Sequence, residues 1–327
     1  MKIISVSAVG LAALLLVSGC GADDPAPARA ASVNVTNCGQ NVSVAAPPQR
    51  ALSLEQNATE ILLSLGLADR MIGTSYQTDP VLPELRDEYE RVPVLAARYP
   101  SREAVLDAQP DFVYSTFTSA YAGDAAGARA DLRKLGVPAY LSRFACEKPA
   151  DGQPVVNFDG LFAEITEVAD LFGVSDRGAR LVAAQRARLD AAVRAADAPA
   201  DTSVLWYYSG TSTPYVAGSG GLPAAISTLL GVRNAYGDAK QTWPAGNWEQ
   251  IAERNPDVIV VADLTRGGDG DSARSKIDFL RSNPVTAQLD AVKAGRFITV
   301  SGSSMDPSVR SVAAVEQVSA GLAELPR

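Results

Sequence analysis

Two glutamates, Glu103 and Glu249, occupy the same position in a segment that occurs twice in this chain. In both copies, residues 101–115 and 247–261, a Pro-Asp pair follows the glutamate at the same spacing and precedes a run of β-branched or aromatic residues. Proline ends a helix and biases the residue before it towards extended geometry. Each copy therefore predicts a short helix, a turn and a buried strand, and the duplication predicts two lobes of similar build. The chemistry that such paired carboxylates offer is charged hydrogen bonding to a partner at two separate points.

Histidine is absent from the sequence, and its absence excludes several kinds of site. A Ser-His-Asp triad, a Cys-His pair, a His-rich zinc site and a His-ligated haem all need it. No Gly-Lys dipeptide occurs, so a Walker A loop is excluded as well. The formal net charge of −8 argues against nucleic acid as a partner, because phosphate binding needs clustered lysine and arginine. We therefore expect no catalytic residue, no metal site and no resident cofactor.

The first nineteen residues predict an export signal. Lys2 precedes an apolar run, Val9 to Val17, that is too short for a membrane-spanning helix with its flanks. The sequence Leu-Val-Ser-Gly-Cys that ends at Cys20 resembles a bacterial lipobox, which predicts a lipid on Cys20 and attachment to the extracytoplasmic face of the cell membrane. An ordinary cleaved signal with an incidental cysteine is the alternative. Residues 20–31, rich in Ala and Pro, predict a flexible tether.

Cys38 and Cys146 are the other two cysteines. In an exported protein an even pair suggests a disulfide. It would enclose a loop of about a hundred residues, for which the loop-entropy model allows roughly 4–5 kcal/mol. Two free buried thiols are the alternative, since the sequence does not show whether the two Cα atoms approach closely enough.

From Arg50 onwards, short apolar runs alternate with helix-like segments. This alternation is typical of βαβ units and predicts a mostly parallel sheet in each half of the chain. We expect a helix capped by Asn57, with Glu60 completing a capping box. Residues 76–100 are expected to be mostly loop, with a later helix over 125–135. The expected strands are 51–54, 71–75, 112–116 and 137–142, then 203–208, 257–262 and 296–300.

Two consecutive helices are expected in the middle of the chain. The first, over 158–173, is amphipathic, and the second runs from Ser175 to about Ala196. At 1.5 Å per residue the second helix spans about 30 Å, which suits a rigid strut better than a hinge. The predicted division is an N-terminal lobe at 32–174, an interlobe helix at 175–197 and a C-terminal lobe at 198–327.

The order of these features resembles a substrate-binding lipoprotein of a type II ABC importer, in the class that carries iron–siderophore complexes, cobalamin and related bulky ligands. The resemblance covers residues 40–325 and implies an α/β fold with two parallel-sheet, Rossmann-like lobes bridged by a single long rigid helix, the class III periplasmic-binding-protein fold. Within the class, the chain resembles actinobacterial lipoproteins with paired cysteines, some of them assigned to a deazaflavin precursor. The motifs that carry the resemblance are the lipobox, Arg-x-Leu-Ser-Leu from Arg50, Asn-Ala-Thr-Glu-Ile-Leu from Asn57, Leu-Gly-Leu-x-Asp-Arg from Leu65, the two Glu/Pro-Asp units, Tyr-Val-Ala-Gly from Tyr215, and Trp243-Pro244.

The resemblance implies a role for the repeated glutamates. In such proteins a glutamate at the outer tip of each lobe seats in an arginine pocket of a dimeric permease, which works with a cytoplasmic ATPase. Glu103 and Glu249 match these positions. The alternative is that each glutamate merely stabilises the first turn of its helix through the macrodipole, and the two roles are compatible.

The ligand cleft is expected between the lobes, at the carboxyl ends of the strands. Aromatic side chains there offer rigid apolar contact, and arginines offer two-point contact to carboxylates or phosphates. Either Tyr207 or Tyr208 is expected in the cleft, because successive residues of a strand point to opposite faces. For the same reason, Trp206 or Tyr208 could equally face the core. The candidate ligand-binding residues are Gln56, Tyr76, Arg98, Tyr99, Phe117, Tyr121, Tyr208, Trp243, Arg266 and Arg310.

These features together predict a binding protein without catalytic activity. We expect a monomer that captures a ferric siderophore or a similar bulky chelate or cofactor and delivers it to an ABC permease. A deazaflavin precursor and cobalamin are alternative ligands, and a ligand-binding surface sensor is an alternative role. A chelatase-like enzyme of similar build would need histidine at its metal. The candidate residues combine aromatic side chains with two or three arginines. This combination favours a ferric hydroxamate over ferric citrate or a ferric catecholate, because those two ligands need several arginines. It suits a deazaflavin nearly as well.

Overall fold

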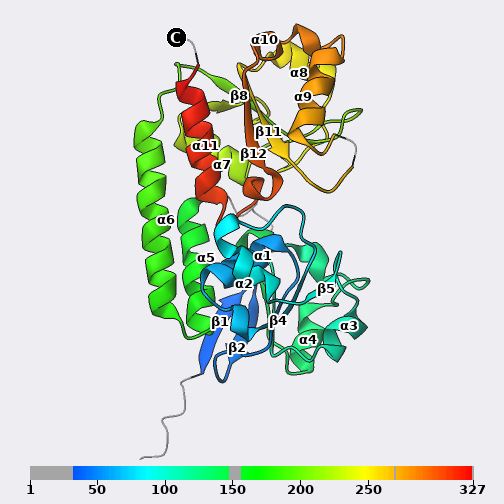
Figure 1. Ribbon diagram of the computed structural model, residues 1–327, viewed down its shortest axis with the longest axis vertical. Coiled ribbons are helices and arrows are strands. Elements are labelled where there is room, and N and C mark those ends of the chain that lie inside the picture. Colours follow the sequence, from blue (N-terminus) through cyan, green and yellow to red (C-terminus); the bar gives the residue numbers. More distant parts are fainter. Residues whose placement is uncertain (1–31, 147–155, 269, 326–327) are drawn as a thin grey trace, which may run out of the picture. The chain divides into compact units, whose positions relative to one another are not determined.

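The computed structural model describes residues 32–146, 156–268 and 270–325. One parallel sheet is formed by residues before the long helix α6 (Ser175–Ala195) and a second, mostly parallel sheet by residues after it, and α6 runs alongside both (Figure 1). We call the part of the chain before α6 the first lobe and the part after it the second lobe. This arrangement confirms the predicted α/β fold of two parallel-sheet lobes bridged by one helix.

The first lobe opens with an antiparallel hairpin of β1 (Val33–Asn37) and β2 (Gln40–Val44), which the sequence analysis did not anticipate. Its sheet has the strand order β5-β4-β3-β6-β7, with every neighbouring pair parallel. The strands are β3 (Ala51–Ser53), β4 (Met71–Ser75), β5 (Val94–Ala96), β6 (Phe112–Ser115) and β7 (Ala139–Leu141). The helices are α1 (Gln56–Ser64), α2 (Arg86–Glu90), α3 (Arg102–Asp107), α4 (Arg129–Lys134) and α5 (Phe158–Leu171), with 3-10 turns η1 (Ala68–Arg70), η2 (Pro83–Leu85), η3 (Thr118–Tyr121) and η4 (Arg143–Ala145).

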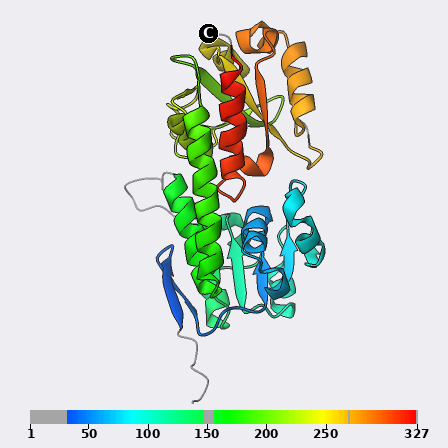
Figure 2. The same ribbon diagram turned by 60° about the vertical axis from the view of Figure 1, so that its left-hand side comes forward.

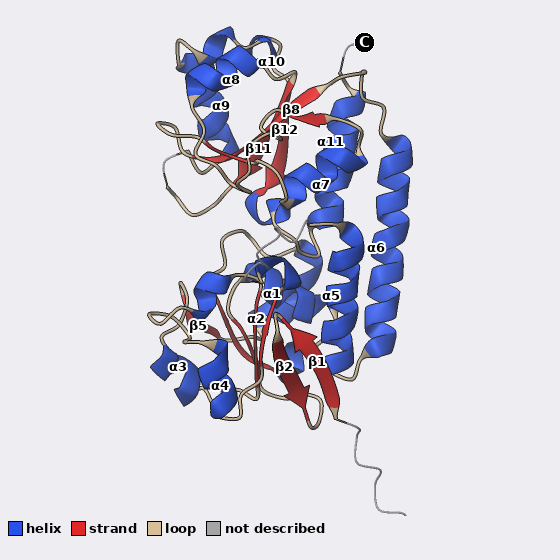
Figure 3. Ribbon diagram, turned by 180° about the vertical axis from the view of Figure 1, so that it is seen from behind, coloured by secondary structure: helices blue, strands red, loops and turns tan. Residues whose placement is uncertain are grey.

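The second lobe has the parallel order β10-β8-β11-β12, and β9 pairs antiparallel with β8. Figure 3 shows β8, β11 and β12 of this sheet. Its strands are β8 (Ser203–Ser209), β9 (Tyr215–Val216), β10 (Arg233–Asn234), β11 (Val258–Asp263) and β12 (Phe297–Ser301). Its helices are α7 (Leu222–Leu229), α8 (Trp248–Arg254), α9 (Ala273–Ser282), α10 (Asp290–Lys293) and α11 (Ser311–Ala323), with 3-10 turns η5 (Thr286–Gln288) and η6 (Gly302–Met305). The central strands β6 and β8 are almost wholly buried, as expected for parallel strands covered on both faces.

Residues 76–100 are mostly loop, as expected, and they also contain α2 and the edge strand β5, which pairs with β4. One expectation for the first lobe was wrong in detail. The helix expected over 125–135 is shorter, since the backbone of Gly127 is left-handed, with φ of +86°, and α4 begins only at Arg129.

Helix α6 touches both lobes. It packs against α5 in the first lobe and against α11 in the second (Figures 1 and 2). Gly178 permits the close approach to α5, because a Cβ atom there would lie 2.4 Å from the Cβ of Ala169. On the other side, the Gln185 amide donates to the carbonyl of Val309 at 3.1 Å, and the Ser319 hydroxyl donates to the carbonyl of Ala192 at 2.8 Å. These contacts support the interpretation of α6 as a strut.

The disulfide joins Cys38 in the β1–β2 turn to Cys146, with Cα atoms 5.1 Å apart. Cys146 follows η4, so the bond ties the hairpin to the end of the first sheet. The predicted signal at 1–19, the tether at 20–31 and the lipidation site Cys20 lie outside the described residues. Within the described ranges, none of the helices has the length and apolar character needed to cross a bilayer.

The repeated Pro-Asp pair has the same structural role in both lobes. Both Asp111 carboxylate oxygens accept hydrogen bonds, from the backbone amides of Gln49 at 2.7 Å and Arg50 at 2.8 Å, immediately before β3. The Asp257 carboxylate accepts from the backbone amide and the hydroxyl of Ser203, both at 2.8 Å, where β8 begins. Each aspartate therefore fixes the register between the strand that it precedes and the neighbouring strand.

We expect Asp257→Ala to lower the free energy of unfolding by about 1.5–3 kcal/mol, because it removes a charged acceptor from two donors at the start of a buried strand. Urea unfolding monitored by circular dichroism measures this change. Asp278→Ala is the control, since Asp278 is exposed and its nearest cation, Arg274, lies 3.8 Å away; it should change stability by less than about 0.5 kcal/mol. Equal effects of the two substitutions would contradict the role given to Asp257.

Candidate functional site

A cavity of about 300 Å³ lies at the carboxyl ends of the strands of both sheets. Residues that directly follow β3, β4 and β6 line it from the first lobe, and residues at or beyond the ends of β8, β11 and β12 line it from the second. This is the edge at which α/β sheets bind ligands. Its lining consists of Glu55, Gln56, Asn57, Tyr76, Thr78, Tyr99, Phe117, Tyr208, Tyr215, Trp243, Arg266, Ser303 and Asp306.

Most of the predicted ligand-binding residues line this cleft. They are Gln56, Tyr76, Tyr99, Phe117, Tyr208, Trp243 and Arg266. Tyr207 does not reach the cleft: it faces the opposite side of β8, its ring packs edge-on against Trp248 at 5.2 Å, and its hydroxyl donates to the carbonyl of Gly210. Trp206 is in the core, where its indole nitrogen donates to the Ser227 hydroxyl at 2.9 Å.

Three predicted residues do not line the cavity. Tyr121 is buried in the core of the first lobe, and its hydroxyl donates to the carbonyls of Val113 and Tyr140 because η3 folds back onto the sheet. Arg98 is exposed and is not among the lining residues. Arg310 is buried and forms an ion pair with Glu60.

Six of the thirteen residues that line the cleft are aromatic. Tyr76 and Tyr99 pack edge to face with ring centres 4.8 Å apart, and Tyr208 packs against Trp243 at 5.1 Å. Burial raises the pKa of Tyr99 to about 12, so its hydroxyl stays protonated at neutral pH. The aromatic part of the wall is therefore rigid, and the other seven lining residues are polar or charged.

Arg266 is the arginine of the cleft lining. Its guanidinium lies 5.6 Å from the ring centre of Tyr208 and donates to the Asp271 carboxylate at 2.7 Å. The same carboxylate accepts from the Gly268 amide at 2.7 Å. Beneath the loop that carries Arg266 and Asp271, the fully buried ammonium of Lys276 donates to the carbonyls of Ala262 and Asp271. Burial lowers the pKa of Lys276 to about 8. The hydrogen bonds of Lys276 and Asp271 therefore fix the position of the loop that carries Arg266.

Glu55, at the start of α1, lines the cleft but was not among the predicted site residues. Its carboxylate caps the helix by accepting from the amides of Asn57 at 2.7 Å and Ala58 at 3.1 Å, and it also accepts from the amide and hydroxyl of Thr116. The predicted capping box of Asn57 and Glu60 is therefore wrong, because Glu55 already satisfies the first amides and Glu60 binds Arg310. Burial raises the pKa of Glu55.

Three polar contacts join the lobes around the cleft. The Arg310 guanidinium binds both carboxylate oxygens of Glu60, with the Nε–Oε2 distance at 2.6 Å, and donates to the carbonyl of Pro80 at 2.7 Å. The Asp79 carboxylate accepts from the amide and hydroxyl of Ser303. The Thr265 hydroxyl donates to the carbonyl of Thr78 at 2.8 Å. These bonds hold the two lobes together on one side of the cavity.

A family model described as periplasmic binding protein matches residues 52–303. The chain belongs to the periplasmic binding protein family. A vitamin B12-binding protein of Vibrio campbellii is 26% identical over 235 residues, which cover 71% of this chain and 77% of that protein.

Solved structures show the same fold. A periplasmic binding protein from Veillonella parvula has a TM-score of 0.79 and 27% identity, covering 90% of this chain and 99% of that one. A protein of an ABC-type Fe3+-hydroxamate transport system from Saccharomonospora viridis has a TM-score of 0.74 and 23% identity, covering 88% and 98%. The periplasmic vitamin B12-binding protein of Vibrio cholerae has a TM-score of 0.64 and 21% identity, covering 85% and 97%.

In this periplasmic binding protein each of the repeated glutamates lies on the first turn of a short helix. In each lobe this helix is distant from α6 (Figure 1). Glu103 is on α3, capped by Ser101, and Glu249 is on α8, capped by Asn247 (Figure 1). Both glutamates are exposed, and within the described residues neither carboxylate has a hydrogen bond or an ion pair. They are therefore available to a partner. Among the described residues there is also no group of three or more acidic or cysteine side chains placed to hold a metal ion.

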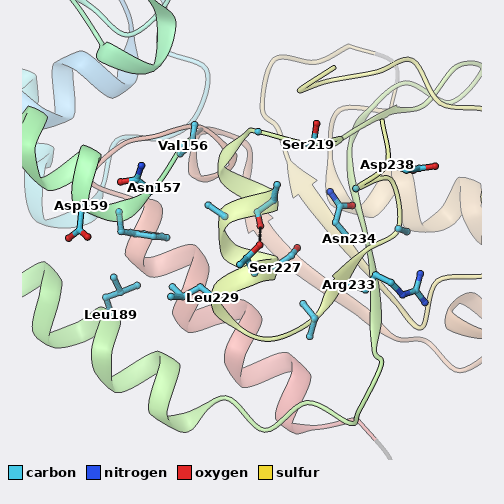
Figure 4. A pocket seen from close by; sticks show the side chains of 18 of the residues that line it. Val156, Asn157, Asp159, Leu189, Ser219, Ser227, Leu229, Arg233, Asn234 and Asp238 are labelled. Carbon is cyan, nitrogen blue, oxygen red and sulfur yellow. Dashed lines mark hydrogen bonds between the residues drawn. The ribbon is translucent and has the colours of Figure 1, made fainter. Parts of the chain in front are cut away.

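A larger hollow, of about 990 Å³, lies between α5, α6 and α7 (Figure 4). It shares no lining residue with the cleft. Two of its three arginines are paired, Arg186 with Asp159 at 2.7 Å and Arg254 with Asp238 at 2.7 Å, and the third, Arg233, is exposed. Because aromatic side chains from both lobes converge on the smaller cleft, at the carboxyl ends of the strands, we take that cleft as the candidate ligand site.

Proposed function

We propose that this periplasmic binding protein captures a bulky ligand in the aromatic cleft and delivers it to the permease of an ABC importer. The observation that carries the proposal is the convergence of aromatic side chains from both lobes on one cavity at the strand ends. Concave, mostly apolar sites with few polar groups are typical of small-molecule binding. Membership of the family supports a binding role rather than an enzymatic one.

The charge of the cleft favours one class of ligand. Arg266 is the arginine of the lining, and its charge is balanced by Asp271, while Glu55 and Asp306 add carboxyl groups. A strongly anionic complex such as ferric citrate or a ferric catecholate would need several arginines. A ferric hydroxamate, with large apolar surface and little negative charge, fits the aromatic wall better. We therefore propose a ferric hydroxamate as the ligand.

Cobalamin is the second candidate. Relatives of this chain are named vitamin B12-binding proteins, at 26% identity or below. A deazaflavin precursor would also suit the stacking rings of Tyr208 and Trp243. A surface sensor would use the same cleft without a permease, and transport assays separate that role from import.

The proposed delivery step depends on a membrane anchor and on two docking residues. We propose that a lipid on Cys20 holds the protein at the extracytoplasmic membrane surface and that Glu103 and Glu249 seat in arginine pockets of the two permease subunits. Two exposed carboxylates without partners in the described residues support the second point. Charged hydrogen bonds of this kind contribute about 1.5–3 kcal/mol each.

Removing aromatic surface from the cleft should weaken ligand binding. We expect Tyr208→Ala and Trp243→Ala each to raise the Kd for the bound ferric hydroxamate by about 10- to 100-fold, because each deletes a large apolar contact worth about 1.5–3 kcal/mol. Isothermal titration calorimetry measures the change. Tyr89→Ala on α2 is the control, since Tyr89 lies outside the cleft lining, and its Kd should match the wild type. Unchanged affinity in both cleft variants would contradict the proposed site.

A further inference from the structure

Two carboxyl groups line the cleft from opposite lobes. Glu55 begins α1 in the first lobe, and Asp306 follows η6 in the second. Glu55 has four hydrogen-bond donors from its own lobe, whereas the Asp306 carboxylate has none among the described residues. The Asp306 carboxylate is thus the open acceptor of the pair.

A third acceptor in the cleft is also open. Asn57 is 2% exposed and lines the same cavity, and its Oδ1 atom is buried without a hydrogen-bond partner within the described residues. A buried amide oxygen without a donor is unfavourable by about 1–3 kcal/mol, so this position favours a ligand that supplies one. By contrast, the nearby amide of Gln56 is saturated: its oxygen accepts from the amides of Thr78 and Asp79, and its nitrogen donates to Glu60 and to the Asp79 carbonyl.

The charges around this end of the cleft do not cancel. Arg266 is neutralised by its partner Asp271 at 2.7 Å, and Arg310 is neutralised by Glu60. Glu55 and Asp306 have no cationic partner among the described residues. The rings of Tyr76, Tyr99, Tyr208 and Trp243 add negative ring faces, which attract cations. The cleft therefore combines open acceptors, net negative charge and aromatic walls.

We propose that the Glu55–Asp306 end of the cleft binds a positively charged N–H group of the ligand, such as a primary ammonium. This inference rests on the proposed function, because it describes one part of the ligand held in the same cleft. The aromatic wall takes the apolar body of the ligand, and the carboxyl pair selects among such ligands by a pendant cation. A neutral chelate with an attached ammonium group fits both parts.

Binding of a cation at this place should depend on pH. Burial, together with the charge of Glu55, raises the pKa of Asp306 to about 7. The other titratable or charged groups around Asp306 are Tyr76 and Tyr99 from the first lobe and Tyr208 and Arg266 from the second, with Asp79 behind Ser303. Protonation of Asp306 below its pKa removes a negative charge, so affinity for a cation should fall as the pH is lowered through about 7.

Three small probes of similar size and different charge test the proposal: benzylammonium, benzyl alcohol and benzoate, titrated into the whole mature protein and followed by tryptophan fluorescence. At about pH 8 we expect benzylammonium to bind at least about tenfold more tightly than the other two. This preference should be lost in Asp306→Asn and reduced at about pH 5.5. Asp306 makes no side-chain bond within the described residues, so the variant should fold; Asp87→Asn on the exposed surface of α2 is the matched control.

Three outcomes overturn the inference: no detectable binding of benzylammonium, equal or tighter binding of benzoate or benzyl alcohol, or an unchanged preference in Asp306→Asn. A second pair of probes separates this inference from the proposed function. These are the ferric complex of desferrioxamine B, which carries a primary ammonium, and that of its N-acetylated derivative, which does not. Equal affinity for the two complexes contradicts the inference alone. Failure of both to bind while benzylammonium binds contradicts the hydroxamate proposal and leaves the cation site supported.

Discussion

Arg310→Ala is expected to lower the free energy of unfolding by about 3–5 kcal/mol, because it leaves the Glu60 carboxylate buried without its cation. The side chain of Glu60 is completely buried, and that of Arg310 is 7% exposed. Arg310 supplies two hydrogen bonds to Glu60 and one to the Pro80 carbonyl. The remaining donors to Glu60, the Leu82 amide at 3.1 Å and the Gln56 amide at 3.2 Å, are neutral.

The control for this substitution is Arg188→Ala. Arg188 also forms a two-point ion pair, with Glu316 at 2.9 and 2.6 Å, but both side chains are substantially exposed. Exposed pairs contribute about 0–1 kcal/mol, so the control should unfold close to the wild type. Adding Glu60→Gln to Arg310→Ala removes the uncompensated charge and should recover part of the loss. Denaturant unfolding of the four proteins measures these differences. Equal stability of Arg310→Ala and Arg188→Ala would contradict the structural role of the buried pair.

The double variant Glu103→Ala/Glu249→Ala is expected to abolish uptake of the ligand by cells while leaving the Kd of the purified protein unchanged. The two glutamates lie on α3 and α8, and neither is among the cleft lining. Their loss removes two charged contacts to the permease, about 1.5–3 kcal/mol each. The loss of favourable macrodipole interactions, about 0.3–1 kcal/mol each, is too small to unfold the protein. Uptake of labelled ligand, beside calorimetry on the purified variant, measures both quantities.

Asp107→Ala/Glu253→Ala is the matched control for the docking prediction. Asp107 and Glu253 are exposed acids on the same two helices, one turn beyond Glu103 and Glu249, so the control removes the same charge from the same elements. It should retain most of the uptake. Full uptake in the Glu103→Ala/Glu249→Ala variant would contradict the docking role, and equal losses in the two double variants would replace specific docking by a general effect of charge.

Local patterns in the sequence predicted the architecture well. Alternating apolar runs predicted the parallel strands, and the duplicated Pro-Asp pair predicted two similar lobes. The structure adds the reason for the aspartate, because Asp111 and Asp257 bind the backbone beside the first strand of each sheet. The β1–β2 hairpin escaped prediction because its strands lie outside the βαβ alternation, which begins only at Arg50.

The candidate site was predicted only in part, because the direction of a side chain depends on distant partners. Arg310 looked like a ligand contact, yet its partner Glu60 is 250 positions away in the sequence. Tyr121 follows a strand end like Phe117, but its hydroxyl finds two carbonyls inside the lobe. Glu55 was overlooked because Asn57 and Glu60 offered a capping box. A glutamate directly after a strand and before a helix was the signal that could have identified it.

Equilibrium titration of the purified mature protein with ferric hydroxamates, cobalamin, haem and deazaflavins tests the central claim most directly. Trp243 lies in the cleft wall, so occupancy should change tryptophan fluorescence. We predict saturable one-to-one binding of a ferric hydroxamate with a Kd on the order of 1 μM or tighter, together with loss of the signal in Trp243→Phe. Saturable binding of none of these compounds would contradict the proposed function, and binding of cobalamin alone would reassign the ligand.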